Sequence, residues 1–184
     1  MTGRPGPRRH LALIGLSGTG KSTIAPLLAR QLGRTAADVD RLVEARCGGA
    51  TVAEVFADRG EPGFRAVESE VLAEVLAGPD AVVATGGGVV LDPANRDLLA
   101  RTATVVWLRA DVDALVDRLA RTAEERPLLA GDPGTTLRRL AAEREPLYDE
   151  VADLVVDATG LRPQQVVDQI ERDLRAGGTE DDPR

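Results

Sequence analysis

Residues 15–22 constrain this sequence more than any other stretch. They read Gly-Leu-Ser-Gly-Thr-Gly-Lys-Ser and fit Gly-x-x-x-x-Gly-Lys-Ser/Thr, the P-loop or Walker A pattern. The short apolar run 11–14 before them suits a buried parallel strand, and apolar side chains recur at helical spacing over residues 23–28. The sequence therefore predicts a strand, a glycine loop and a helix, in that order.

The predicted loop is suited to binding phosphate. Its glycines allow successive backbone N–H groups to turn inward as a nest, and the following helix directs the positive end of its dipole to the same place. Lys21 should reach the β- and γ-phosphates of ATP, and the Ser22 hydroxyl should ligate Mg²⁺. A glycine-rich turn without a ligand is the alternative. The residues expected to contact ATP are Gly18, Thr19, Gly20, Lys21, Ser22 and Thr23.

Lys21 is the only lysine in the chain. Arginine has replaced lysine at the other long basic positions, so a lysine kept here indicates a need for a compact ammonium group. A planar guanidinium does not fit a tight phosphate cradle in the same way. We therefore expect Lys21 to be catalytic.

Composition limits the classes of protein that remain. With 184 residues, of which 43% are hydrophobic and 2% aromatic, the chain can form one domain with a core of Ala, Val and Leu. A net charge of −7 argues against nucleic acid as the main partner. No apolar run approaches the roughly 18 residues of a membrane span. The sequence predicts a single domain over residues 10–176, disordered tails at 1–9 and 177–184, and a monomer.

The single cysteine and the single histidine carry no predicted chemistry. Cys47 excludes an internal disulfide and fits a reducing cytoplasm. It has no activating histidine near it in sequence, so we interpret it as a small residue at a helix end. His10 precedes the first strand and is expected at the surface.

Short apolar runs alternate with amphipathic segments along the chain. Alternation of this kind predicts right-handed βαβ units, hence an α/β fold with a five-stranded parallel sheet between two layers of helices. Ligands then bind at the carboxyl ends of the strands. The runs are 11–14, 35–39, 81–84, 104–108 and 154–156.

Two carboxylates follow the second run. If the strand continues through them, Asp38 and Asp40 point to the same side, because residues two apart share a face. One is expected to hold Mg²⁺ through water, and we assign Asp38 to that role. The other, Asp40, is expected to accept the proton of a hydroxyl group or to fix that group. A solvated turn is the alternative.

Two helices are predicted at 51–57 and 63–76, within a substrate-binding helical subregion at 41–77. The only phenylalanines, Phe56 and Phe64, flank the break between the helices and either border a binding site or fill the core. Arg65 opens the second helix, where the dipole does not favour a cation. An external anion is therefore a plausible partner for Arg65.

Two further segments are predicted to contact ligands. Gly86, Gly87 and Gly88 follow the third run and allow the backbone to approach a ligand closely and offer N–H donors. Residues 121–133 are polar, are interrupted by proline and glycine, and are expected to form a mobile lid. Arg121 and Arg126 on that lid can close over phosphates, unless the segment is only a solvated loop.

With these motifs in order, the chain resembles the shikimate kinases over residues 11–170. The residues that carry the resemblance are those of the P-loop, Asp38 and Asp40, Gly63-Phe64-Arg65-x-x-Glu68, the three glycines at 86–88, Arg126-Pro127-Leu128-Leu129 and Arg144-x-Pro146-Leu147-Tyr148. The resemblance implies a P-loop fold of the nucleoside-monophosphate-kinase type. It also implies transfer of the ATP γ-phosphoryl group to the 3-hydroxyl of shikimate.

The resemblance also implies roles for individual residues. Asp40, Arg65, Gly87 and Arg144 would contact shikimate, with the two arginines on its carboxylate and Asp40 as the base. Phe56 and Phe64 would border the acceptor site. Arg126 would reach the phosphates and Arg121 would pack near adenine.

Two other functions fit part of the pattern. A different small-molecule kinase of the same fold, such as a gluconate kinase, would share the P-loop. A nucleotide-binding switch without turnover would share it too. The Asp-x-Asp sequence, the triple glycine and the arginine pair favour shikimate. A guanine-specific Asn-Lys-x-Asp motif is absent, since Lys21 is the only lysine.

Overall fold

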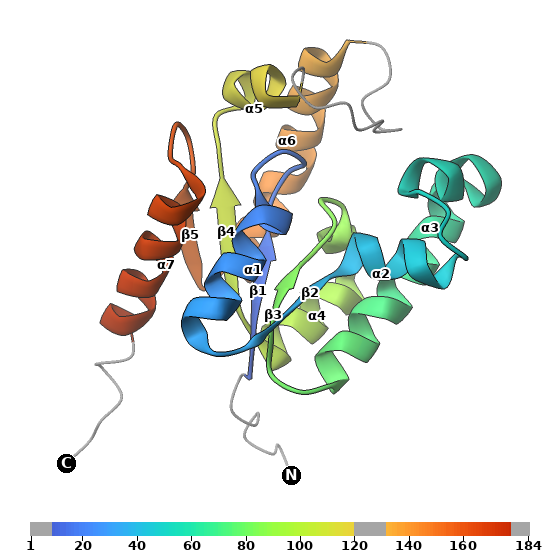
Figure 1. Cartoon of the computed structure of the whole chain (residues 1–184). Coiled ribbons are helices and arrows are strands. Elements are labelled where there is room, and N and C mark those ends of the chain that lie inside the picture. The colour runs from blue at the N-terminus through green and yellow to red at the C-terminus, as the bar shows by residue number, and fades with distance from the viewer. Residues whose placement is uncertain (1–8, 120–131, 178–184) are drawn as a thin grey trace.

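The five predicted strands form one parallel sheet in the computed structural model, which describes residues 9–119 and 132–177 (Figure 1). The strand order is β2-β3-β1-β4-β5, so the strand that leads into the P-loop lies in the middle. The strands are β1 (His10–Ile14), β2 (Thr35–Asp38), β3 (Ala81–Ala84), β4 (Ala103–Arg109) and β5 (Leu154–Asp157).

Helices connect consecutive strands, as the alternation of apolar runs predicted. A short 3₁₀ helix, η1 (Val89–Leu91), follows the triple glycine and was not predicted. The α-helices of the described residues are α1 (Lys21–Leu32), α2 (Val39–Arg46), α3 (Val52–Ala77), α4 (Pro93–Thr102), α5 (Val112–Leu119), α6 (Pro133–Val151) and α7 (Pro163–Gly177).

The sheet is covered on both faces. Along β1, Leu11 and Leu13 belong to a core that they share with α1 and α7. Ala12 and Ile14 point the other way, into a core shared with α3, α4 and α6. Alternate residues of a strand face opposite sides, so a strand buried on both faces reads as a continuous apolar run. The three-layer α/β/α arrangement is confirmed, and Figure 1 shows α1 and α7 on one side of the sheet.

The segment after β2 is more helical than predicted. The start of helix α2 was missed, although Val39 and Val43 are fully buried at i, i+4 spacing and Asp38 caps the helix. Cys47, expected at a helix end, is the C-cap of α2. The predicted break between the next two helices lies at Gly60, whose φ of 67° is non-helical. The chain resumes the helix at once, so Glu61 and Pro62 belong to it. Arg65 therefore does not open the second segment, and the dipole argument for an external anion there is wrong.

His10 is not a surface residue, contrary to the prediction. It starts the central strand, pairs in register with Ala103 of β4, and is only 1% exposed. Its Nε2 lies 3.1 Å from the carbonyl oxygen of Leu76, near the end of α3. A polar residue at the entry of a strand is buried here because that strand has neighbours on both sides and a helix beneath it.

Several boundaries differ from the prediction. Arg9, expected in a disordered tail, donates its N–H to the Thr102 carbonyl at 3.1 Å, and Gly177 is the last residue of α7. Helix α6 begins at Pro133, which was expected to belong to the lid, because the Asp132 side chain caps the helix. None of the helices in the described ranges has the length and apolar content that a membrane crossing requires.

Gly15 is the glycine on which the junction between β1 and the P-loop depends. Its φ is 135°, and a Cβ atom there would lie 2.4 Å from the Leu108 carbonyl oxygen of β4. We predict that Gly15→Ala lowers the free energy of unfolding by more than about 3 kcal/mol, since a glycine-only conformation and a backbone clash combine. Urea unfolding monitored by circular dichroism measures this change.

Gly33→Ala is the matched control for this prediction. Gly33 also has a positive φ, of 64°, but a Cβ atom there would have no neighbour within 4 Å. Gly33→Ala should lower the free energy of unfolding by only about 1–2 kcal/mol, the cost of the left-handed conformation. Equal losses for the two variants would contradict the steric account of Gly15.

Candidate active site

The P-loop joins β1 to α1 at the carboxyl edge of the sheet. Helices α2, α3, α4 and α6 each begin at a residue whose side chain accepts a hydrogen bond from the first turn. Helix α1 begins after Gly20, and no side chain caps it. No acidic residue lies in its first turn either. The dipole and the uncapped N-terminus of α1 are therefore available to an anionic ligand, which is the requirement for binding phosphate.

Lys21 is positioned by the loop that it follows. Its side chain is 7% exposed, and Nζ donates to the carbonyl oxygens of Gly15 at 2.7 Å and Leu16 at 2.8 Å. The Thr19 hydroxyl donates to the same Leu16 carbonyl at 2.9 Å. The only lysine therefore lies against the backbone of the phosphate loop. Thr19, predicted to contact ATP, uses its side chain to hold the loop together.

The predicted metal ligands lie on two different elements. Ser22 is exposed on the first turn of α1, as is Thr23, which was predicted to contact ATP. Asp38 is half-buried at the end of β2, and its Oδ1 accepts from the backbone N–H of Arg41 at 3.2 Å. One hydroxyl and one carboxylate suit Mg²⁺, which keeps several waters when proteins bind it. Within the described ranges no group of three or more His, Cys, Asp or Glu side chains is placed to bind a metal by itself.

The geometry predicted for the two aspartates is wrong. Strand β2 ends at Asp38, which caps α2, while Asp40 lies in the first turn of that helix. The two carboxylates therefore do not alternate along a strand. Asp40 nevertheless lies beside the triple glycine, because a Cβ atom on Gly86 would be 2.9 Å from Asp40 Oδ1.

Gly86 and Gly88 make room for side chains from α3. A Cβ atom on Gly86 would lie 2.1 Å from Glu68 Oε1, and one on Gly88 would lie 2.2 Å from an Arg65 guanidinium nitrogen. Neither glycine has a positive φ. Small size, and not an unusual backbone conformation, is therefore what these positions require. The sequence predicted that these glycines let the backbone lie close to a ligand. In the described residues, the groups that lie close to them are the side chains of Asp40, Glu68 and Arg65.

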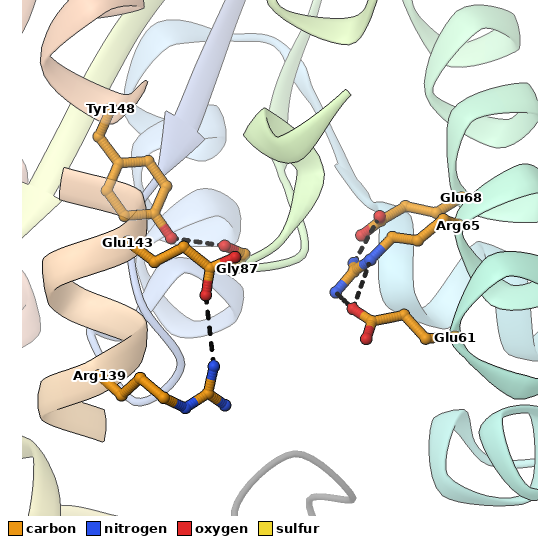
Figure 2. Close-up of polar contacts among 7 residues, drawn as sticks. All are labelled: Glu61, Arg65, Glu68, Gly87, Arg139, Glu143 and Tyr148. Carbon is orange, nitrogen blue, oxygen red and sulfur yellow. Dashed lines mark hydrogen bonds and ion pairs between the residues drawn. The ribbon is translucent and has the colours of Figure 1, made fainter. Parts of the chain in front are cut away.

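Arg65 is held in place by its own helix. Its guanidinium bonds Glu68 at 2.7 Å and Glu61 at 3.1 Å, and Figure 2 shows it between the two carboxylates. It also lies over the rings of Phe64, at 5.2 Å, and Phe56, at 5.8 Å. The rings contact each other, with centroids 4.4 Å apart. Phe64 is buried in the core and Phe56 is half-buried, so the pair both fills the core and supports Arg65.

Glu68 is a buried carboxylate that the sequence analysis did not assign to the site. Burial raises its pKa, the Arg65 cation lowers it, Asp40 raises it further, and the net direction is upward. Among the described residues Glu68 Oε1 has no hydrogen-bond partner, although it is buried. Such an atom is rare in folded proteins and marks a place that water or a ligand can complete.

Arg144 is the second arginine predicted to bind the acceptor, and α6 buries it almost completely. The residue is 5% exposed. In the part of the chain that the structure describes, its buried Nε has no hydrogen-bond partner. Its charge lowers the pKa of Glu68, so it lies in the same environment as Arg65. A buried cation with an unused donor is a site that an anion would stabilise.

Side chains from α4 and α6 fix the triple-glycine turn, and sequence reasoning missed all of them. The Tyr148 phenol donates to the Gly87 carbonyl (Figure 2). Asn95 donates to the Val89 carbonyl at 3.2 Å, and Arg96 donates to the Val90 carbonyl at 2.8 Å. On the other side, Arg118 of α5 donates to the Gly18 carbonyl of the P-loop at 2.8 Å. Tyr148 and Arg118 lie 61 and 100 positions from their partners, so no local pattern could have indicated those two contacts, whereas Asn95 and Arg96 lie only six positions from theirs.

Two predicted site residues cannot be placed. Arg121 and Arg126, and the predicted lid up to residue 131, lie outside the described residues. The residues that are brought together are the P-loop, Asp40, the triple glycine, Arg65 and Arg144. This fold has a phosphate loop followed by an uncapped helix, with the half-buried Arg65 and the buried Arg144 at the same edge of the sheet. These features define a P-loop phosphotransferase of the nucleoside-monophosphate-kinase type.

Comparison with known proteins identifies the family within that class. A family model for shikimate kinase matches residues 17–175. The shikimate kinase of Symbiobacterium thermophilum is 46% identical over 171 residues, which cover 92% of this chain and 98% of that protein. The chain belongs to the shikimate kinase family.

Solved structures agree with this assignment. The structure of the Acinetobacter baumannii shikimate kinase in complex with shikimate superposes with a TM-score of 0.88 at 34% identity, covering 93% of this chain and 95% of that one. The shikimate kinase of Aquifex aeolicus superposes with a TM-score of 0.80 at 31% identity, covering 92% and 98%.

The raised pKa of Glu68 predicts a pH-dependent stability. The folded state holds the proton of Glu68 more tightly than the unfolded state, so ionisation destabilises the fold as pH rises above the ordinary pKa of 4.5. We predict that the free energy of unfolding of the wild type falls relative to Glu68→Gln as pH increases from that value. Urea unfolding of both proteins across a pH series measures the difference.

Glu70→Gln is the control for the Glu68 prediction. Glu70 lies on the same helix, and its side chain is 69% exposed. Its substitution should leave a difference from the wild type that varies little with pH. The raised pKa of Glu68 would be refuted if the difference in free energy of unfolding between the wild type and Glu68→Gln stayed constant with pH, or changed in the opposite direction.

Proposed function

We propose that this chain transfers the γ-phosphoryl group of ATP to the 3-hydroxyl of shikimate, giving shikimate 3-phosphate and ADP. Membership of the shikimate kinase family supports the reaction class. The observation that carries the choice of acceptor is Arg144, a buried cation whose Nε has no partner among the described residues. A small acid with a carboxylate supplies the missing acceptor and charge.

The P-loop is proposed to bind the nucleotide. Backbone N–H groups from Gly18 to Thr23 and the dipole of α1 hold the phosphates, and Lys21 neutralises charge on the γ-phosphoryl group as it moves. Catalysis of this kind depends on positioning and charge stabilisation more than on covalent chemistry with the protein. Arg118 supports the loop from α5 through the Gly18 carbonyl.

The acceptor is proposed to lie between α3, the triple glycine and α6. Arg65 and Arg144 hold its carboxylate, and Gly86, Gly87 and Gly88 allow its close approach. Asp40 accepts the proton of the 3-hydroxyl as the oxygen bonds to the γ-phosphorus and the bond to the departing ADP oxygen breaks. Phe56 and Phe64 support Arg65 from behind.

Mg²⁺ is proposed to accompany ATP. The Ser22 hydroxyl would ligate it directly and Asp38 would hold it through water, a donor set that suits this ion. When bound, the ion neutralises charge on the phosphates. Arg126 on the phosphates and Arg121 near adenine remain predictions, since both lie outside the described residues. We also propose that residues 10–176 form one kinase domain, that 41–77 bind the acceptor, and that the protein is a cytoplasmic monomer.

An acceptor assay tests the proposed function. ADP release is measured with ATP and Mg²⁺ in the presence of shikimate, of gluconate, or of neither. We expect release that depends on shikimate. Release with gluconate alone would assign the chain to another acceptor, and release that is equal with and without either acid would indicate a nucleotide-binding switch.

Arg144→Lys tests the proposed carboxylate contact. Lysine keeps the charge but loses the bidentate geometry of the guanidinium, so we predict that the KM for shikimate rises by about tenfold or more, while that for ATP changes by less than about twofold. Steady-state kinetics with each substrate varied in turn measure both constants.

Arg139→Lys is the matched control, five residues earlier on α6. The Arg139 side chain is 65% exposed and pairs with Glu143 at 3.5 Å, as Figure 2 shows. Arg139→Lys should leave the KM values for shikimate and for ATP within about twofold of the wild type, as expected for a change in a surface ion pair. If Arg144→Lys raised the two KM values equally, Arg144 would not belong to the acceptor site.

A further inference from the structure

We propose that Tyr148 is a positioning residue for the phosphoryl acceptor. Its phenol group links Arg144, which would hold the acceptor carboxylate, to the backbone of Gly87, which lies against the P-loop. This inference rests on the proposed function. Its basis is a set of contacts that join α6, the triple-glycine turn and the phosphate loop.

The hydroxyl of Tyr148 has a defined partner in a fully buried place. Tyr148 is 0% exposed, and its phenol donates to the Gly87 carbonyl oxygen, as Figure 2 shows. It is the only tyrosine in the chain, and Phe56 and Phe64 are the only phenylalanines. A phenylalanine would fill the core equally well, so the hydroxyl itself needs an explanation.

The same phenol also interacts with Arg144. The two residues are four apart on α6 and therefore share a face of the helix. Burial raises the pKa of Tyr148, while the Arg144 guanidinium lowers it through its charge and through side-chain hydrogen bonding. Because burial has the larger effect, the phenol stays neutral. Its proton is donated to Gly87, and its oxygen remains to accept from Arg144.

Gly87 connects Tyr148 to the P-loop, which is proposed to bind the nucleotide. A Cβ atom on Gly87 would lie 3.3 Å from the backbone nitrogen of Ser17 and 3.4 Å from the carbonyl oxygen of Gly15, both in the P-loop. The glycine turn therefore packs directly on the loop that is proposed to hold the phosphates. A bond from Tyr148 to Gly87 fixes the distance between the acceptor arginine and that loop.

The ring of Tyr148 is held independently of its hydroxyl. It packs against the only tryptophan, Trp107 of β4, with ring centroids 5.7 Å apart and an interplanar angle of 37°. Removing the hydroxyl should therefore leave the ring in place. Tyr148→Phe isolates the effect of the two polar contacts from that of core packing.

The test compares Tyr148→Phe with the wild type in steady-state kinetics. We expect the KM for shikimate to rise by about five- to twentyfold, as for the loss of a hydrogen bond that orients a charged group, and the KM for ATP to stay within about twofold. An unchanged KM for shikimate, whether or not the melting temperature falls, would overturn the inference, because a purely structural hydroxyl would affect stability alone.

Thr102→Val is the matched control. The Thr102 hydroxyl donates to the Leu98 carbonyl at 2.8 Å on α4, away from the site. The Thr102→Val variant loses a hydrogen bond from a hydroxyl to a backbone carbonyl, as Tyr148→Phe does. It should lower the melting temperature without changing the KM for shikimate or for ATP. A rise in the KM for shikimate as large as that of Tyr148→Phe would show that general destabilisation, and not positioning, explains the effect.

A second measurement asks whether Tyr148 acts through Arg144. In an Arg144→Lys background, Tyr148→Phe should raise the KM for shikimate by less than about twofold, because the group that it orients is already lost. If the two substitutions acted independently, the increase in the KM for shikimate of the double variant would equal the product of the two single increases, and that result would contradict the proposed linkage. If the wild type did not phosphorylate shikimate at all, the proposed function would fail. If it did and Tyr148→Phe behaved as wild type, only the positioning role would fail.

Discussion

A buried positive charge at the carboxyl edge of the sheet determines much of this structure. Arg144 is almost completely removed from solvent, and the transfer of a charged group from water is costly unless partners compensate. The compensation in the described residues comes from the neighbouring Glu68 carboxylate and the Tyr148 phenol. It is incomplete at the Arg144 Nε, and that donor is what an acidic ligand would satisfy.

The scaffold around this charge consists of close contacts between distant segments. Gly86 and Gly88 allow Glu68 and Arg65 to reach the edge of β3, where larger residues would collide with them. The glycine turn in turn packs on the P-loop through Gly87. The arginines that we propose to bind the acceptor and the phosphate loop are therefore parts of one packed unit, which suits a reaction that depends on the relative position of two substrates.

Sequence reasoning predicted the elements that repeat a local pattern. The strands were found because runs buried on both faces are continuously apolar, and the P-loop because its spacing is specific. The start of helix α2 was missed because Val39 and Val43 are its only buried residues and Asp38 was interpreted as part of a strand instead of a helix cap. His10 was misplaced because its burial depends on neighbours that are distant in sequence, such as Leu76.

The candidate site was predictable at the level of residue type and less so at the level of contacts. The sequence predicts Arg65, Arg144, Asp40 and the triple glycine as candidate site residues, and the structure brings them together. Glu68 and Tyr148 were part of the motifs but were given no role, because their contacts join segments far apart, as the separation of 61 positions between Tyr148 and Gly87 illustrates. Only the packing of α3 and α6 against the sheet reveals those contacts.

The central claim is that a carboxylate on the acceptor completes the environment of the buried Arg144 and its half-buried neighbour Arg65. It is tested most directly by calorimetric titration of the protein with shikimate and with the methyl ester of shikimate, which keeps the hydroxyl groups but has no charge. The account predicts that the ester binds at least about tenfold more weakly, since a charge-assisted bidentate contact is lost. Equal affinity for the acid and the ester would contradict it.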